Sequence, residues 1–339
     1  MTTTRVVLPG VVEPDGLRVE RTDVPVPGPD QALVAVEASG VSFAEQQMRR
    51  GRYYDQPRFP FVPGYDLVGT VSAVGSATSP ALVGTRVAAL LGTGGWTTHA
   101  VVDADALVPV PTGLDPAAAS TLVVNGLTAW RMLHRCAHVR AGQTVLVHGV
   151  NGGVGTVLAE LAAIAGARVL GTAAPRHHDA LRALGVEPVD YALDGLEQRV
   201  RALAPDGVDA VFDHVGGDVL TVSHRLLRRG GTLVSYGSAD TRDAHGNATW
   251  TILRLMARLQ WWNLRPGGHR ATFFNVWGGK RNPARFRAGV REDLGQVFAL
   301  AAEGRLRTQV AATFPLDRVA DAVRLAESRT VVGKVVLVP

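Results

Sequence analysis

A glycine-rich turn directly after an apolar, strand-like run constrains this fold more than any other stretch. The segment 145–155 is "VLVHGVNGGVG", and its glycines are Gly149, Gly152, Gly153 and Gly155. A pyrophosphate needs backbone N–H donors at a helix N-terminus, and a Cβ in the turn would block its approach. The pattern therefore predicts a strand, a phosphate-binding turn and a helix, with Asn151 and Val154 also contacting the bound ligand.

Strand-like and helical runs alternate regularly on both sides of this turn. We expect strands at 144–149, 167–173, 208–215, 231–237 and 272–277, with helices between them that include 154–165 and 179–184. Such alternation implies crossover connections and a doubly wound parallel sheet. A six-stranded sheet of this kind is typical of a dinucleotide-binding domain.

The two ends of the chain have a different pattern. Short β-rich runs punctuated by Gly and Pro occupy residues 4–110 and predict a mostly β unit. Two amphipathic helices, at 284–304 and 316–328, and a closing strand at 333–339 are expected to complete that unit. We therefore predict an α/β protein with domains at 1–124, 125–280 and 281–339.

Composition excludes several classes of function. The formal net charge is +5, but the arginines are scattered and no basic run is interleaved with aromatics, so no nucleic-acid partner is expected. A single cysteine, Cys136, excludes an intrachain disulfide and a cysteine-rich zinc lobe. The start lacks a secretory signal, and charges interrupt the longest apolar stretch, so we expect a cytoplasmic protein without a membrane partner.

The end of the second predicted strand indicates which dinucleotide is bound. Folds that prefer NAD place Asp or Glu there, whereas this chain has "VLGTAAPRHH" and no acid. Thr172 and Ala173, followed by Arg176, His177 and His178, offer donors and positive charge to a 2′-phosphate. This predicts NADPH, with Arg176 as the principal contact; the alternative for the two histidines is an ordinary exposed loop.

Further cofactor contacts are expected at the carboxyl edge of the sheet, where ligands of open α/β folds bind. The segment "SYGS" follows the fifth predicted strand, and "FFN" lies in the last one. The residues expected to contact the cofactor here, together with a lysine of the closing strand, are Tyr236, Gly237, Ser238, Phe274, Asn275 and Lys334.

Three motifs together resemble a known family. They are "ASGVSFAEQQMRRGRYYDQPRFPFVPGYDLVGTVSAVG", "HGVNGGVG" and "VVGKVVLVP". The chain resembles the zinc-independent quinone oxidoreductase branch of the medium-chain dehydrogenase/reductases, close to the VAT-1-like group. This resemblance implies a GroES-like catalytic domain built from both chain ends, a Rossmann domain, and a cleft between the two. It also implies a homodimer that pairs the last Rossmann strand, here "TFFNVW".

The resemblance also bears on metal binding. Zinc-dependent relatives carry a Cys in the segment matched by "ASGVS" and a His-Glu pair in the segment matched by "PGYD". Here these segments supply Val41 and Ser42, and Tyr65 and Asp66. Because zinc sites are built from thiolate and imidazole ligands, no catalytic metal is expected.

Without zinc to polarise a carbonyl, hydride from NADPH passes most readily to an activated acceptor, an enone, enal or quinone. The resemblance places Tyr53 against the substrate, with Tyr54 as the adjacent alternative, and both proton donation and simple stacking stay open. Ser42 and Glu45 match an Asn and an acid that lie near the nicotinamide in relatives. For Glu45, a surface helix charge is the alternative.

The remaining site residues follow from matched positions and aromatic character. Asn125 and Thr128 match positions that line the nicotinamide in relatives, and a mid-helix Asn has low helix preference. Tyr65 and Trp96 are expected in the substrate pocket. The apolar run 249–263 is expected to pack between domains or against substrate, with a membrane surface as the alternative.

We therefore predict an NADPH-dependent, zinc-free oxidoreductase that transfers hydride to an activated C=C bond or a quinone. One alternative is a zinc-free carbonyl reductase or alcohol dehydrogenase that uses Tyr53 as the acid. Another is an NADPH-binding protein without turnover, which the replacement of Asn by Ser42 supports. Product analysis and the decay of nicotinamide absorbance distinguish the three.

Overall fold

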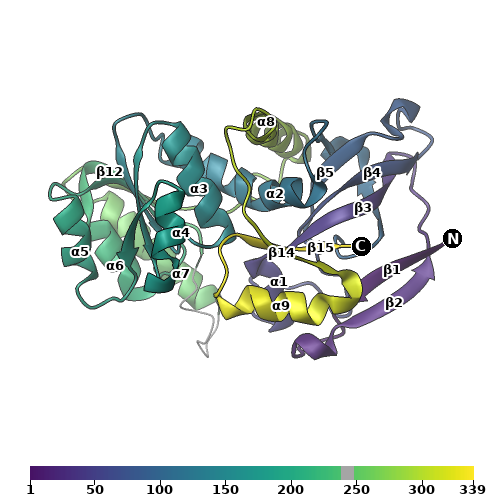
Figure 1. The fold of residues 1–339 in the computed structure, drawn as a ribbon, viewed down its shortest axis with the longest axis horizontal. Helices are drawn as coiled ribbons and strands as arrows, with labels where there is room; N and C mark the ends of the chain where they lie inside the picture. Colours follow the sequence, from purple (N-terminus) through teal and green to yellow (C-terminus); the bar gives the residue numbers. More distant parts are fainter. Residues whose placement is uncertain (238–247) are drawn as a thin grey trace. The chain divides into compact units, whose positions relative to one another are not determined.

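The computed structural model describes residues 1–237 and 248–339. The chain divides into two compact units, which are described one at a time (Figure 1). The first unit contains Met1–Leu127 and Gly279–Pro339, and the second contains Thr128–Gly278. The predicted boundaries after residues 124 and 280 fall close to these divisions.

The first unit is mostly β-structure and is built from both ends of the chain. Strands β1 (Thr2–Val7) and β2 (Arg18–Asp23) form an antiparallel pair. The seven-stranded sheet has the order β14-β15-β3-β4-β5-β7, with β6 paired to β3. Its strands are β3 (Gln31–Val41), β4 (Asp66–Val74), β5 (Arg86–Leu90), β6 (His99–Asp103), β7 (Val108–Pro109), β14 (Val310–Pro315) and β15 (Lys334–Val338).

Pairing of β15 with β3 joins the C-terminus to the N-terminal half of this unit. The two strands are antiparallel, with Val336 opposite Gly40. The tail therefore contributes a strand to the same sheet as the N-terminal half of the chain. Strand β14, which pairs with β15 in parallel, was not predicted.

Four longer helices accompany these strands, namely α1 (Phe43–Arg49), α2 (Pro116–Trp130), α8 (Pro283–Ala302) and α9 (Val319–Ser328). Helix α2 runs on into the second unit. The Asp115 carboxylate accepts a hydrogen bond from the N–H of Ala118 at 2.9 Å, and Pro116 occupies the first turn, as the sequence predicts. Helix α9 packs Val319 and Val323 into a core with Trp96 and Val335.

The second unit contains a six-stranded, all-parallel sheet of order β10-β9-β8-β11-β12-β13. Its strands are β8 (Thr144–His148), β9 (Arg168–Ala173), β10 (Glu187–Asp190), β11 (Val208–Asp213), β12 (Leu227–Ser235) and β13 (Arg270–Phe273). The order reverses between β8 and β11, and this confirms the predicted doubly wound sheet. Helices α3 (Gly153–Ile164), α4 (His178–Ala183), α5 (Leu196–Leu203), α6 (Gly217–Arg225) and α7 (Ala248–Asn263) connect or follow the strands.

Two features of this unit differ from the sequence-based expectation. Strand β10 and helix α5 were not predicted. The β10 segment, "EPVD", has neither an apolar run nor strand alternation. The last strand ends at Phe273 instead of extending over 272–277. Beyond it, the N–H of Phe274 bonds the Ser235 carbonyl at 2.7 Å, and the chain turns where Gly278 N–H bonds the Asn275 carbonyl at 2.9 Å.

Helix α7 divides its apolar residues between the core and the surface. Leu259 and Trp262 are buried against the sheet core, while Leu253, Met256 and Trp261 are exposed. The helix is therefore anchored by one face only. Within residues 1–237 and 248–339, no helix is both long enough and apolar enough to cross a bilayer.

Candidate active site

The glycine turn follows β8 and leads into α3 in the second unit. Gly149 has φ 61°, and a Cβ there would lie 2.2 Å from Cε1 of His214. A Cβ on Gly155 would lie 2.6 Å from the carbonyl oxygen of Gly149. Both positions therefore need glycine for the turn to pack, and the turn presents backbone without Cβ atoms there, as expected of a pyrophosphate site.

The other predicted turn residues lie at the start of the same helix. Gly152 is the N-cap of α3, and Gly153 and Val154 are in its first turn. Asn151 immediately precedes the cap. The turn is thus at the point where the strand order reverses, which is where open α/β sheets bind ligands.

The residues at the end of β9 and just after it, predicted together as contacts for a 2′-phosphate, differ in exposure. Arg176 is exposed in a short 3-10 turn, whereas His177 in the same turn is buried. The Nε2 atom of His178 lies 3.2 Å from the Ala173 carbonyl oxygen. Thr172 is buried, and its hydroxyl contacts Gly149 N at 3.2 Å and His148 Nδ1 at 3.1 Å. The prediction of Thr172 as a phosphate donor is therefore wrong, because its hydroxyl is already committed to these bonds.

The end of the fifth strand lies close to His214. The centroids of the Tyr236 and His214 rings are 5.7 Å apart. The backbone N–H of Tyr236 donates a hydrogen bond to the Asp213 carbonyl at 2.9 Å. Burial raises the pKa of the Tyr236 phenol above its usual range. A Cβ on Gly237 would lie 3.2 Å from the His214 carbonyl oxygen. Ser238 lies outside the described residues.

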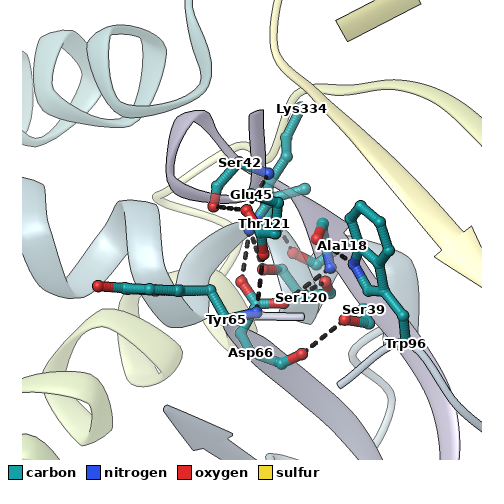
Figure 2. A network of polar contacts seen from close by, with 11 residues as sticks. Ser39, Ser42, Glu45, Tyr65, Asp66, Trp96, Ala118, Ser120, Thr121 and Lys334 are labelled. Atoms are coloured by element: carbon teal, nitrogen blue, oxygen red, sulfur yellow. Dashed lines mark hydrogen bonds and ion pairs between the residues drawn. The ribbon is translucent and has the colours of Figure 1, made fainter. Parts of the chain in front are cut away.

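The first unit contains a buried polar network (Figure 2). At its centre, Lys334 Nζ lies 2.5 Å from Asp66 Oδ2, and both side chains are almost fully buried. Asp66 Oδ1 also accepts the Gly40 N–H at 2.7 Å. A Cβ on Gly40 would meet the Lys334 side chain, so glycine is needed to admit it. Lys334, predicted as a cofactor contact, is thus buried and paired with Asp66 within this unit.

Ser42 and Glu45 form a capping box at the start of α1. One Glu45 oxygen, Oε2, accepts the Ser42 N–H at 3.0 Å and the Ser42 hydroxyl, while Oε1 accepts the Tyr65 N–H at 2.7 Å. Complete burial raises the pKa of Glu45, although the Ser42 bond opposes that effect. Glu45 is thus no surface charge, and it fixes Tyr65 to the first turn of α1.

Three tyrosines gather beside this network. The Tyr53 and Tyr65 hydroxyls are hydrogen-bonded, and their rings meet edge to face with centroids 6.2 Å apart. The Tyr54 ring is 4.6 Å from that of Tyr53 and is half exposed. Burial, followed by the neighbouring Tyr65, raises the pKa of Tyr53 above its usual range, so this phenol stays protonated and is able to donate.

Trp96 has a different role from the one predicted. It is 1% exposed, and its indole N–H bonds the Gly40 carbonyl at 3.1 Å. The prediction of Trp96 as a wall of the substrate pocket is therefore wrong, since it is a core residue. Asn125 and Thr128 are both buried on α2.

The two segments that match zinc-ligand segments of relatives lie against each other. The Ser39 hydroxyl donates to the Asp66 carbonyl at 2.6 Å, close to the Asp66–Lys334 pair. An ammonium therefore neutralises the carboxylate, and the neighbouring Tyr65 offers neither thiolate nor imidazole. Among the described residues, no group of three His, Cys, Asp or Glu side chains is arranged to hold a metal ion.

A row of buried polar residues lies under the glycine turn and was not predicted from the sequence. The row contains His148, Asp213 and Ser223. A polar residue at the end of an apolar strand was the available signal, since "VLVH" and "VFD" both end in one.

Comparison with known proteins places this architecture in a family. Residues 28–112 match the alcohol dehydrogenase GroES-like domain, and residues 184–337 match the zinc-binding dehydrogenase domain. The synaptic vesicle membrane protein VAT-1 homolog of Rattus norvegicus is 31% identical over 326 residues, which cover 93% of this chain and 78% of that protein.

Solved structures agree with this assignment. A mycobacterial protein in complex with NADPH has a TM-score of 0.84 at 28% identity, over 99% of this chain and 100% of that one. The quinone oxidoreductase of Pseudomonas syringae pv. Tomato DC3000 has a TM-score of 0.84 at 26% identity, again over 99% and 100%. The chain belongs to the medium-chain dehydrogenase/reductase superfamily of oxidoreductases, as a member like VAT-1 and the quinone oxidoreductases.

Proposed function

We propose that this protein is an NADPH-dependent, zinc-free oxidoreductase acting on activated C=C bonds or quinones. The observation that carries the proposal is the side-chain-free cradle at Gly149 and Gly155, at the point where the strand order reverses. A similar structure binds NADPH, and another is a quinone oxidoreductase. Bound NADPH would supply a hydride, so the chain has to bind, orient and protonate the acceptor.

NADPH is favoured over NADH by the residues after β9. The strand end carries no carboxylate that would repel a 2′-phosphate, and Arg176 is exposed there. Since Thr172 is buried and His178 contacts the Ala173 carbonyl, the role of receiving the phosphate falls to Arg176.

Tyr53 supplies the proton in this proposal. When hydride reaches the β-carbon of an enone, negative charge develops on the carbonyl oxygen, and a donor aimed at that oxygen is worth about 10²-fold in rate. Partial burial raises the pKa of Tyr53, so the phenol stays protonated and can donate a hydrogen bond to that oxygen as its charge develops, while contact with Tyr65 holds the hydroxyl in place. Tyr65 is itself held by Glu45, so Glu45 acts through Tyr65 and not on the substrate.

We also propose a homodimer in which β13 of one copy pairs with β13 of the other, as the family resemblance implies. The side-chain amide of Asn263 already bonds the Ala271 N–H at 2.6 Å and the Ala271 carbonyl at 2.9 Å. A second copy would therefore pair with backbone beyond Ala271. Sedimentation at several concentrations tests this, and a monomer at every concentration would contradict it.

Turnover tests the proposed function. Purified protein is mixed with NADPH and a panel of enones and quinones, and the nicotinamide absorbance is followed. We expect decay with at least one acceptor class, about 10²-fold slower in Tyr53→Phe than in the control Tyr191→Phe, which changes an exposed tyrosine of the second unit. No decay with any acceptor would favour the non-catalytic alternative, and equal rates for the two variants would remove Tyr53 as the proton donor.

A further inference from the structure

A row of four buried side chains runs beneath the glycine turn of the second unit. Thr172 lies at the end of β9, His148 at the end of β8, Ser223 on α6 and Asp213 at the end of β11. His148 Nδ1 is 3.1 Å from the Thr172 hydroxyl, and Nε2 is 2.9 Å from the Ser223 hydroxyl. The Ser223 hydroxyl is 2.8 Å from Asp213 Oδ2. Each of the four is no more than 1% exposed.

The direction of these hydrogen bonds follows from the number of protons available. The single Ser223 hydroxyl proton has two acceptors within 2.8 Å, Asp213 Oδ2 and the Val219 carbonyl, and neither can donate. The bond between Ser223 and His148 therefore needs its proton from His148 Nε2. In a neutral imidazole, Nδ1 is then the acceptor, and it receives the Thr172 hydroxyl proton.

Burial favours this neutral form, because it lowers the pKa of His148. The Thr172 oxygen is then free to accept the Gly149 N–H at 3.2 Å. With the Ser223 proton on Asp213 Oδ2, the hydrogen bonds run in one direction, from Gly149 through Thr172, His148 and Ser223 to Asp213.

The two ends of the row are parts of the backbone near the turn. At one end, Gly149 is the first residue of the glycine cradle. At the other, Asp213 Oδ1 accepts the N–H of Val215 at 2.7 Å and of Gly216 at 2.9 Å, just before α6. The row therefore joins the carboxyl ends of β8, β9 and β11, the strands on either side of the point where the sheet order reverses.

We propose that His148, as its neutral Nε2–H tautomer, is a positioning residue that couples the glycine turn to the 213–216 loop and so holds both in the conformation that binds the dinucleotide. This inference rests on the proposed function, since it assumes that the turn binds NADPH. His148 contacts no ligand in this account and acts only through Thr172 and Ser223.

A double-mutant cycle at the two ends of the imidazole tests the coupling. Thr172→Val and Ser223→Ala keep the approximate shape of each side chain and remove one partner of His148. We expect each to weaken NADPH binding about 10-fold in calorimetry, because a buried polar group is left without a partner. The double variant should bind little more weakly than either single variant, because one break already releases the row. If the two contributions were independent, the double variant would bind NADPH about 100-fold more weakly, and this result would overturn the proposal.

Thr232→Val is the matched control, since Thr232 is a buried threonine of the same sheet that lies outside the row. It should leave the NADPH dissociation constant unchanged. An equal loss in this variant would mean that any buried threonine of the sheet has the effect, and would contradict a specific role for the row.

The tautomer is measured on the unsubstituted protein, and a variant is needed only to assign the His148 signal. In ¹⁵N-histidine-labelled protein, with His148 assigned by its loss in His148→Gln, Nε2 should be protonated and Nδ1 unprotonated at neutral pH. A protonated Nδ1 or a charged ring would overturn the proposal. If the unsubstituted protein has this tautomer but binds no NADPH, the proposed function fails instead.

Discussion

Asp66 and Lys334 are 268 residues apart in the chain and form a buried ion pair, with 2.5 Å between Oδ2 and Nζ. The pair joins the strand after the tyrosine cluster to the closing strand of the chain. The same contact therefore joins the two ends of the chain within the first unit and neutralises a buried carboxylate.

Removing one partner of the Asp66–Lys334 pair should lower the free energy of unfolding substantially. Lys334→Met leaves the Asp66 carboxylate buried without its cation, which typically destabilises by about 3–5 kcal/mol. Asp66→Asn in the same background should recover part of this loss, because it removes the uncompensated charge. Urea unfolding measures both, and a loss below about 1 kcal/mol in Lys334→Met would contradict the role given to the pair.

The sequence predicted the second unit well because its signals are local. Apolar runs, helical periodicity and the glycine turn each lie within a few residues, and the crossover rule then determines a parallel sheet. Strand β10 was missed because four residues with a proline and two acids lack any periodicity.

The candidate site was less predictable, because its contacts depend on tertiary structure. Nothing near Lys334 in the sequence indicates a partner at Asp66, so a cofactor contact was an equally reasonable expectation. Trp96 was predicted to line the substrate pocket because an aromatic residue after a run of glycines occurs both in pockets and in hydrophobic cores. The sequence alone does not distinguish the two. The buried partners of Thr172 could be identified only once β8, β9 and β11 lay side by side.

Gly155 is predicted to be irreplaceable in the turn. In Gly155→Ala the new Cβ lies 2.6 Å from the backbone oxygen of Gly149, so we expect a loss of about 1–3 kcal/mol in stability and weaker NADPH binding. Gly295→Ala is the control, because a Cβ there has nothing within 4 Å and α8 should gain about 0.5–1 kcal/mol. Thermal unfolding with and without NADPH compares them, and similar behaviour of the two variants would argue against the cradle.

Arg176 should distinguish the two dinucleotides. A charge-assisted bond to the 2′-phosphate is worth about 1.5–3 kcal/mol, so Arg176→Ala should weaken NADPH binding about 10–100-fold and leave NADH binding nearly unchanged. Arg182→Ala serves as control, since Arg182 is a nearby exposed arginine paired with Asp179 at 2.6 Å. Equal losses for NADH and NADPH in Arg176→Ala would refute the assignment.

His224 should make the second unit sensitive to acid. Burial, with His269 and Arg265 nearby, lowers the pKa of His224 to about 4, and its ring stacks on Trp262 with centroids 4.3 Å apart. The unfolded chain binds this proton near the ordinary histidine pKa of 6.5, so the free energy of unfolding should fall as the pH decreases from about 6.5 to about 4. His224→Gln should reduce that slope in urea titrations at each pH, and an unchanged slope would contradict the assignment.

Isotope transfer from NADPH tests the central claim most directly. The protein is supplied with NADPH deuterated at C4 of the nicotinamide ring on the transferred face and with an enone acceptor, and the product is analysed by mass spectrometry and NMR. We expect a saturated ketone with deuterium on its β-carbon and the carbonyl intact. Deuterium on a carbinol carbon, or unconsumed NADPH with unchanged enone and quinone acceptors, would contradict it.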